Sequence, residues 1–131
     1  MKRSLFITVF TILLVWACPA DAQYATGADS IVFVKLIHDY GTIAQGSDGM
    51  CEFVFTNKGN KPLILSNVRA SCGCTAPTWP RAPILPGQKG TIKVGYNTQI
   101  LGGFSKVVSV MSNASNSMVV LTIRGNVVPR N

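Results

Sequence analysis

Short runs in which apolar and polar residues alternate recur along most of the chain. From Cys51 to Thr56, one set of alternate side chains is Cys51, Phe53 and Phe55, and the other set is mixed in character. A period of two indicates a β-strand, because successive side chains in an extended chain point to opposite faces. Similar runs predict strands over residues 31–37, 38–43, 51–56, 63–68, 92–97, 104–111 and 119–124.

Turn-forming residues separate these runs at short intervals. Ser47-Asp48-Gly49, Pro86-Gly87 and Gly102-Gly103 are turn signals, and residues 57–62 and 113–117 are rich in polar residues. No stretch after residue 22 repeats apolar residues at the spacing of an amphipathic helix. The pattern therefore predicts an all-β protein, an immunoglobulin-like β-sandwich of about seven strands, in one domain without internal repeats.

One face of each predicted strand should be dry, because the two sheets of a sandwich pack face to face. Cys51 shares a face with Phe53, so we expect its thiol to be buried. Leu63-Ile64-Leu65 is apolar on both faces, which leaves the register at Leu65 open. The residues expected to share one core are Phe53, Phe55, Leu65, Ile92, Val94, Tyr96, Val119, Leu121 and Ile123.

The first 22 residues have the layout of a secretory signal peptide. Lys2 and Arg3 precede an uncharged apolar run over residues 5–17, and Ala20-Asp21-Ala22 then supplies the small residues of a cleavage site. The apolar run is shorter than the ~20 residues that a membrane-spanning helix needs, which argues against an anchor. The sequence therefore predicts export.

Cleavage after Ala22 would leave residues 23–30 as a flexible lead-in and residues 31–128 as the domain. The alternative is a lipoprotein in which Cys18 carries the lipid. The bulky Trp16 departs from the small residues usual before such a cysteine.

The composition fits a folded domain and argues against nucleic-acid binding. The chain has 131 residues, a formal net charge of +7, 47% hydrophobic residues and 13% charged residues. That balance can bury a core, which argues against intrinsic disorder. The basic residues after residue 22 stand singly, without the clustering or aromatic interleaving of a nucleic-acid footprint. They are predicted to form a solvated surface.

Three cysteines would remain after cleavage, namely Cys51, Cys72 and Cys74. An oxidising compartment favours disulfides, but an odd count leaves one thiol over or paired outside the chain. The sequence leaves all three pairings open. The Cys72-Gly73-Cys74 segment could pin its loop, form a strained redox bridge, bind Cu(I) through soft thiolates, or link covalently to a partner.

We expect Cys72 and Cys74 to form no bridge with each other, and at least one of them to be accessible. The proline-rich residues 71–90 predict a loop or edge segment, with the two cysteines at a strand end and Gly73 at a bend. In an extended chain, Cα atoms two residues apart are separated by about 6.5–7 Å. That distance is near the ~6.8 Å upper limit for a disulfide, so a bridge would need a tight turn.

The common metal and catalytic sites are not expected. A closed zinc site takes four ligands, whereas the chain after residue 22 offers three cysteines and His38. Cys72 and Cys74 are therefore the metal candidates, for Cu(I), and Cys51 and His38 are further candidate site residues. The few carboxylates form no evident catalytic pair, and Asp39 should point away from His38 on a strand. No catalytic residue is assigned, and the protein is predicted not to be an enzyme.

Six motifs in chain order carry a resemblance to a known family. They are His38-Asp39-Tyr40-Gly41-Thr42-Ile43, Phe53-Val54-Phe55-Thr56-Asn57-Lys58-Gly59, Ser71-Cys72-Gly73-Cys74-Thr75, Pro83-Ile84-Leu85-Pro86-Gly87, Gly103-Phe104 and Leu121-Thr122-Ile123-Arg124-Gly125. Over roughly residues 31–128 the chain resembles the DUF1573 family of bacterial secreted and envelope proteins, common in Bacteroidota. That family is similar to immunoglobulin-like domains of the ASPM/SPD-2/Hydin and major-sperm-protein type. The resemblance implies a fold and an exported location, and no established activity.

These features together predict a non-catalytic binding or structural module of the bacterial envelope, in the periplasm, at the cell surface or outside the cell. Its partner would be a protein or another envelope component that docks at sheet edges or loops, with no nucleic acid and no transmembrane segment after cleavage. The alternative is a thiol redox or Cu(I)-binding protein that uses Cys72 and Cys74. No other cofactor is expected.

Overall fold

The computed structural model describes residues 30–131. The predicted signal peptide, Cys18 and residues 23–29 of the predicted lead-in lie outside the described residues. In the described part of the chain, no helix is long and apolar enough to span a membrane.

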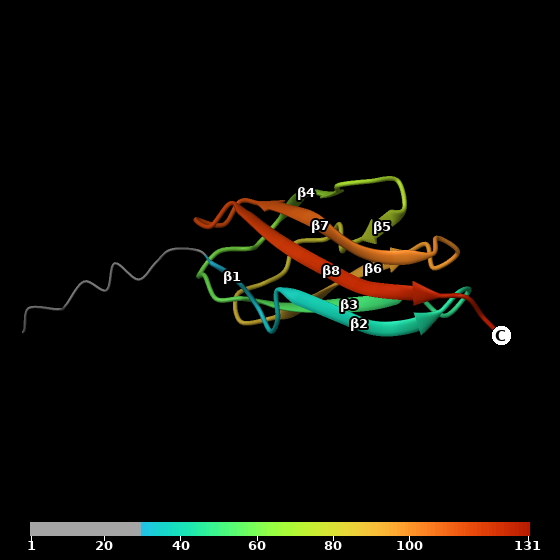
Figure 1. Ribbon diagram of the computed structural model, residues 1–131. Helices are drawn as coiled ribbons and strands as arrows, with labels where there is room; N and C mark the ends of the chain where they lie inside the picture. The colour runs from blue at the N-terminus through green and yellow to red at the C-terminus, as the bar shows by residue number, and fades with distance from the viewer. Residues whose placement is uncertain (1–29) are drawn as a thin grey trace, which may run out of the picture.

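Eight strands form two four-stranded sheets that pack as a sandwich (Figure 1). Sheet A has the order β1-β3-β6-β5, and sheet B has the order β2-β8-β7-β4. Neighbouring strands are antiparallel, except that β2 runs parallel to β8. The strands are β1 (Ile31–Phe33), β2 (Ile37–Ala44), β3 (Met50–Asn57), β4 (Leu65–Ala70), β5 (Thr75–Thr78), β6 (Lys89–Tyr96), β7 (Gly102–Ser112) and β8 (Met118–Val128). The predicted all-β, immunoglobulin-like sandwich is confirmed.

The predicted core is confirmed almost completely. Of the nine residues expected there, all except Val119 are buried, and Val119 is half-buried and packs against the others. Cys51 is buried as expected, with 6% of its surface exposed. The sequence therefore predicted correctly which alternate side chains of each strand point inward, because the apolar ones face the opposite sheet.

Two glycines lie where an aromatic ring crosses the inner face of a strand. A Cβ atom on Gly90 would stand only 2.4 Å from Cζ of Phe55, and one on Gly125 would stand 3.0 Å from the Phe104 ring. Phe104 also stacks on Tyr96, with ring centroids 3.7 Å apart. The absent side chains therefore make room for rings that join the two sheets.

The structure corrects one predicted strand, the run over residues 31–37. β1 ends at Phe33 on the edge of sheet A, and β2 begins at Ile37 on the edge of sheet B. Residues 34–36 carry the chain between the sheets. Apolar Val34 and Leu36 flank Lys35 in this crossing, so the sequence still alternates as a strand does and holds no signal of the break.

Candidate functional site

The segment with Cys72 and Cys74 forms the corner at which the chain passes from sheet B to sheet A. β4 ends at Ala70 on the edge of sheet B, and β5 begins at Thr75 on the edge of sheet A. This confirms the predicted position at a strand end. Both cysteines are half-buried, so the predicted accessibility is partly met.

The prediction that Cys72 and Cys74 stay unbridged is wrong, because the two form a disulfide. Their Cα atoms are 5.3 Å apart, less than an extended chain would allow. The Thr75 N–H donates to the Cys72 carbonyl oxygen at 3.4 Å, which closes a turn around Gly73. The change of sheet forces this turn, and the turn brings the two sulfurs together.

We expect thiol titration to distinguish Cys51 from the two bridged cysteines. Cys51 is the free cysteine among residues 30–131, and burial raises the pKa of its thiol. The native protein that starts at Gln23 should therefore react slowly with a thiol reagent. Denatured protein should expose one thiol, and denatured, reduced protein should expose three. Rapid reaction of two thiols in the native protein would contradict the bridge.

His38, Tyr40 and Cys51 lie on the opposite side of the molecule, where β2 is the edge of sheet B and β3 is next to the short edge strand β1 of sheet A. Nδ1 of His38 lies 2.8 Å from Nζ of Lys35, and the His38 ring contacts Tyr40 edge-on with centroids 4.5 Å apart. Partial burial, reinforced by the Lys35 charge, lowers the pKa of His38, so the imidazole is neutral near pH 7 and accepts from Lys35. The Tyr40 hydroxyl donates to the Gly49 carbonyl at 2.6 Å, and burial raises the pKa of Tyr40.

The candidate residues therefore do not form one centre. His38 stands on β2 and Cys72 follows β4, and these strands are the two opposite edges of sheet B. A Cys72–His38 catalytic pair is excluded by this separation. Across residues 30–131, no three His, Cys, Asp or Glu side chains come close enough to hold a metal ion together.

The edge of sheet A beside His38 is incompletely paired, a feature that the sequence did not reveal. β1 covers only residues 55–57 of β3, and the Val34 N–H adds a bond of 3.0 Å to the Val54 carbonyl. Alternate residues of a strand direct their backbone groups to the same edge, so Glu52 faces the same side as Val54. No described residue pairs with the Glu52 backbone on that side. Residues 50–53 therefore present an open edge.

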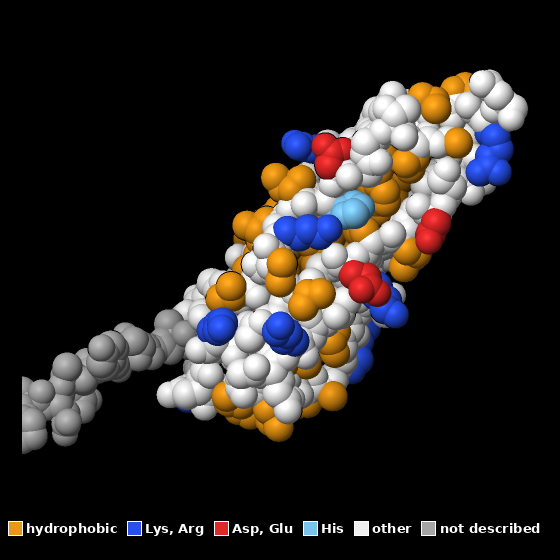
Figure 2. Space-filling model, turned by 90° about the horizontal axis from the view of Figure 1, so that it is seen from below, with side chains coloured by type: hydrophobic (Ala, Val, Ile, Leu, Met, Phe, Trp, Pro, Cys, Tyr) orange, Lys and Arg blue, Asp and Glu red, His pale blue; other side chains and the backbone are white. Residues whose placement is uncertain are grey.

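Exposed apolar side chains surround this open edge. Figure 2 looks at this side and shows hydrophobic side chains on both sides of the single histidine. Val34 is 76% exposed, and large parts of four further side chains are accessible to solvent. These four are Val32, Leu36, Ile37 and Met50.

Comparison with known proteins gives a family and a fold. A family model described as "Protein of unknown function (DUF1573)" matches residues 31–127. No curated protein sequence is significantly similar to the chain.

Several solved structures share the fold at low sequence identity. A protein of unknown function from Porphyromonas gingivalis W83 is 16% identical with a TM-score of 0.68, and the match covers 82% of this chain and 51% of that one. The PapD-like domain 7 of human CEP192 is 6% identical with a TM-score of 0.67, covering 100% and 99%. The Vibrio cholerae VesB protease is 12% identical with a TM-score of 0.59, covering 74% and 31%. The chain thus spans about half of the first structure and a smaller part of the protease.

Proposed function

Because the chain belongs to the DUF1573 family, whose function is unknown, we propose a function from its own surface. The protein is a non-catalytic immunoglobulin-like module of the bacterial envelope that binds an extended segment of another envelope protein. The segment adds as a strand to the open edge of β3 at residues 50–53.

The unpaired backbone of Glu52 is the observation that carries this proposal. A free N–H and C=O at a sheet edge are satisfied by an extended polypeptide, which supplies the complementary groups in the same spacing. Met50 is less available, because its N–H already donates to Oδ1 of Asp48 at 2.9 Å. The incoming strand would lie against β3 just beyond the end of β1, where residues 34–36 leave the sheet.

The surroundings of this edge favour a partner segment that carries apolar side chains. The exposed Val34, Leu36 and Met50 offer it dispersion contacts and burial from water. The other sheet edges are less suited to strand addition. β5 has four residues and contains Pro77. Shifts of register interrupt β2 between Asp39 and Thr42 and β4 between Leu65 and Asn67.

Replacing Glu52 by proline is expected to abolish this binding. Glu52→Pro removes the N–H that faces the open edge and leaves the bonds between β3 and β6 in place, because those involve the alternate residues. Peptides selected from a displayed library of random nonapeptides serve as the probe, with affinity measured by calorimetry. The expected loss is at least about tenfold, the size of one net hydrogen bond of ~1.4 kcal/mol.

Glu52→Ala is the matched control, because it removes the same side chain and keeps the N–H. It should bind the selected peptides as the unaltered protein does, and the peptide should slow hydrogen exchange at the Glu52 amide. Equal binding by both variants, or a library that yields no binder, would refute strand addition at this edge.

The proposal includes no enzymatic role, because the polar side chains of His38 and Asp39 are already engaged by other residues. His38 is engaged by Lys35 and Tyr40, and Asp39 is engaged by Arg124 at 3.0 Å. Neither residue has a reactive thiol beside it, since Cys51 is buried and Cys72 is bridged.

The envelope location rests on the first 22 residues of the sequence. Protein recovered from cells should then begin at Gln23, as N-terminal sequencing would show. Recovery of a lipid-modified chain that begins at Cys18 would contradict cleavage after Ala22 and support the lipoprotein alternative.

A thiol redox role is the second candidate, and the half-buried Cys72–Cys74 disulfide favours it. A dithiol reductant would pass two electrons and two protons to the bridge, giving two thiols and an oxidised reductant. Thiol counts across a series of dithiol-to-disulfide ratios test this role. A bridge that stays intact at every ratio would refute it. Cu(I) binding would require the reduced pair, because the bridged sulfurs are not thiolates.

A further inference from the structure

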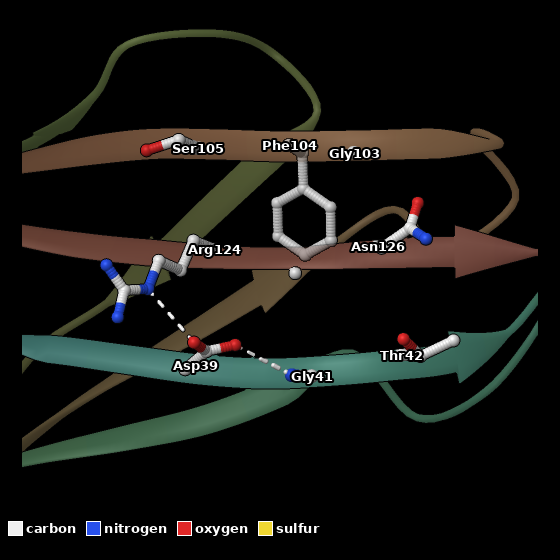
Figure 3. A pocket seen from close by; sticks show the side chains of 9 residues that line it. Asp39, Gly41, Thr42, Gly103, Phe104, Ser105, Arg124 and Asn126 are labelled. Carbon is white, nitrogen blue, oxygen red and sulfur yellow. Dashed lines mark hydrogen bonds and ion pairs between the residues drawn. The ribbon is translucent and has the colours of Figure 1, made fainter.

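A shallow depression lies on the outer face of sheet B, on the face turned away from the core. It measures about 430 Å³ and is open to solvent. That volume falls within the ~300–1,000 Å³ of small-molecule sites. Figure 3 shows its side chains arising from β2, β8 and β7 around the end of the sheet.

The register of three strands builds the depression as two lateral rows. Arg124 of β8 stands between Asp39 of β2 and Ser105 of β7. In the next row, Asn126 stands between Thr42 of β2 and Gly103 of β7. Directly opposed side chains in neighbouring strands are about 5 Å apart, which is the spacing of groups that can bind one small ligand together.

Asp39 is held in place by two hydrogen bonds. Its Oδ1 accepts from the Gly41 N–H at 2.8 Å, and its Oδ2 accepts from Nε of Arg124 at 3.0 Å (Figure 3). Gly41 has a φ of 65°, a conformation that glycine adopts at no steric cost. The Gly41 N–H and then Arg124 lower the pKa of Asp39, so the carboxylate stays ionised and cancels the charge of Arg124.

The other hydrogen-bonding groups of the depression have no partners within residues 30–131. The terminal nitrogens of Arg124 lie away from Asp39 in Figure 3, and Nε makes the one ion pair recorded for this side chain. The side chains of Thr42, Ser105 and Asn126 likewise make no hydrogen bond with the described part of the chain. Hydrogen-bond donors and acceptors therefore lie side by side in the depression, without partners in the described part of the chain.

The floor of the depression lacks side chains. Gly103 contributes none, and the Phe104 ring lies beneath Gly125 on the inner side of the sheet. The ring is fixed from behind by its stacking on Tyr96. A floor without side chains, inside a rim of free hydrogen-bonding groups, leaves room for a compact ring that carries hydroxyls.

We propose that this depression binds a neutral saccharide, with a pyranose ring over the glycine floor and its hydroxyls on the side chains of Arg124, Asn126 and Ser105. Hydroxyls donate and accept, as this mixed rim requires. An anionic ligand is disfavoured because Asp39 already neutralises the guanidinium. The site lies on the outer face of sheet B, away from the open edge of β3, so it is independent of the function proposed above.

Gly103→Val tests the proposal by filling the depression. A Cβ atom on Gly103 would have its nearest neighbour, the Gly125 carbonyl oxygen, at 3.9 Å, so the strand accepts the change. The matched control is Ser109→Val, which places the same side chain on the outer face of β7 beyond the depression. The probes are maltose, cellobiose, diacetylchitobiose and lactose as neutral saccharides, and glucuronate and citrate as anions.

Binding is followed by the amide NMR shifts of the folded protein at millimolar ligand. At least one neutral saccharide should shift Gly41, Thr42, Gly103 and Asn126, and Gly103→Val should abolish those shifts while Ser109→Val retains them. Asp39→Asn should transfer the preference to glucuronate, because Arg124 then carries an uncancelled charge. The proposal is overturned if no neutral saccharide shifts these amides, if the anions bind better to the unaltered protein, or if Gly103→Val binds equally well.

Discussion

Replacing Gly90 by alanine is expected to lower the free energy of unfolding by about 3 kcal/mol, the upper end for overpacking a core. The new Cβ atom would stand 2.4 Å from Cζ of Phe55 and 2.9 Å from two further ring carbons. Phe55 is fully buried, so its ring has no empty space to move into. Equilibrium unfolding in urea measures the effect.

Gly103→Ala is the control for this substitution, because its new Cβ atom meets no clash. It should leave stability unchanged or raise it slightly, since alanine restricts the unfolded chain. On its own, Phe55→Leu should lower the free energy of unfolding. In the protein that carries Phe55→Leu, however, Gly90→Ala should lower it by less than in the unaltered protein. Additive effects of the two changes would show that the ring is not the source of the clash.

Replacing Asn57 by aspartate is expected to cost about 4 kcal/mol at neutral pH, the range for an uncompensated buried charge. Asn57 is 1% exposed, and its Nδ2 donates to the carbonyl oxygens of Lys61 at 2.7 Å and Ile84 at 2.9 Å. Its Oδ1 accepts from the Gly59 N–H at 2.9 Å. Asn57→Asp puts an acceptor where two carbonyl oxygens need a donor, whereas Asn57→Ala should cost about 3 kcal/mol for three lost bonds.

The cost of Asn57→Asp should decrease as the pH falls. Burial beside carbonyl oxygens raises the pKa of the introduced carboxyl above its unfolded value of ~3.9. A raised folded pKa means that stability is greatest below the unfolded pKa and is lost as the pH rises through the folded pKa. Asn97→Asp is the control, because that exposed side chain only accepts, from the Gln99 N–H at 3.1 Å. Equal, pH-independent costs at both positions would contradict the role of Asn57.

The position of Asn57 shows where sequence patterns stop being informative. The segment Asn57-Lys58-Gly59 has the composition of an exposed turn, and the chain does turn there. The Asn57 side chain is nevertheless buried, because it bonds the carbonyl of Ile84 from a segment 27 residues away. That contact exists only once the connection between β5 and β6 folds back over the end of β3.

The sequence by itself determined the sheet class, the parity of most strands and the residues of the core. Phe53 and Phe55, or Leu121 and Ile123, follow from a period of two, which is a local property of an extended chain. The burial of Cys51 follows from the same parity. These inferences need no knowledge of which strands are neighbours.

Only the tertiary structure decided which chemical groups meet. Cys72 and Cys74 form a bridge because β4 and β5 belong to different sheets and the chain must turn sharply between them. Asp39 meets Arg124 across 85 residues because β2 pairs in parallel with the last strand. The open edge at Glu52 exists because β1 leaves sheet A after three residues. Strand order and crossing points depend on non-local packing, which the alternation within a single strand does not encode.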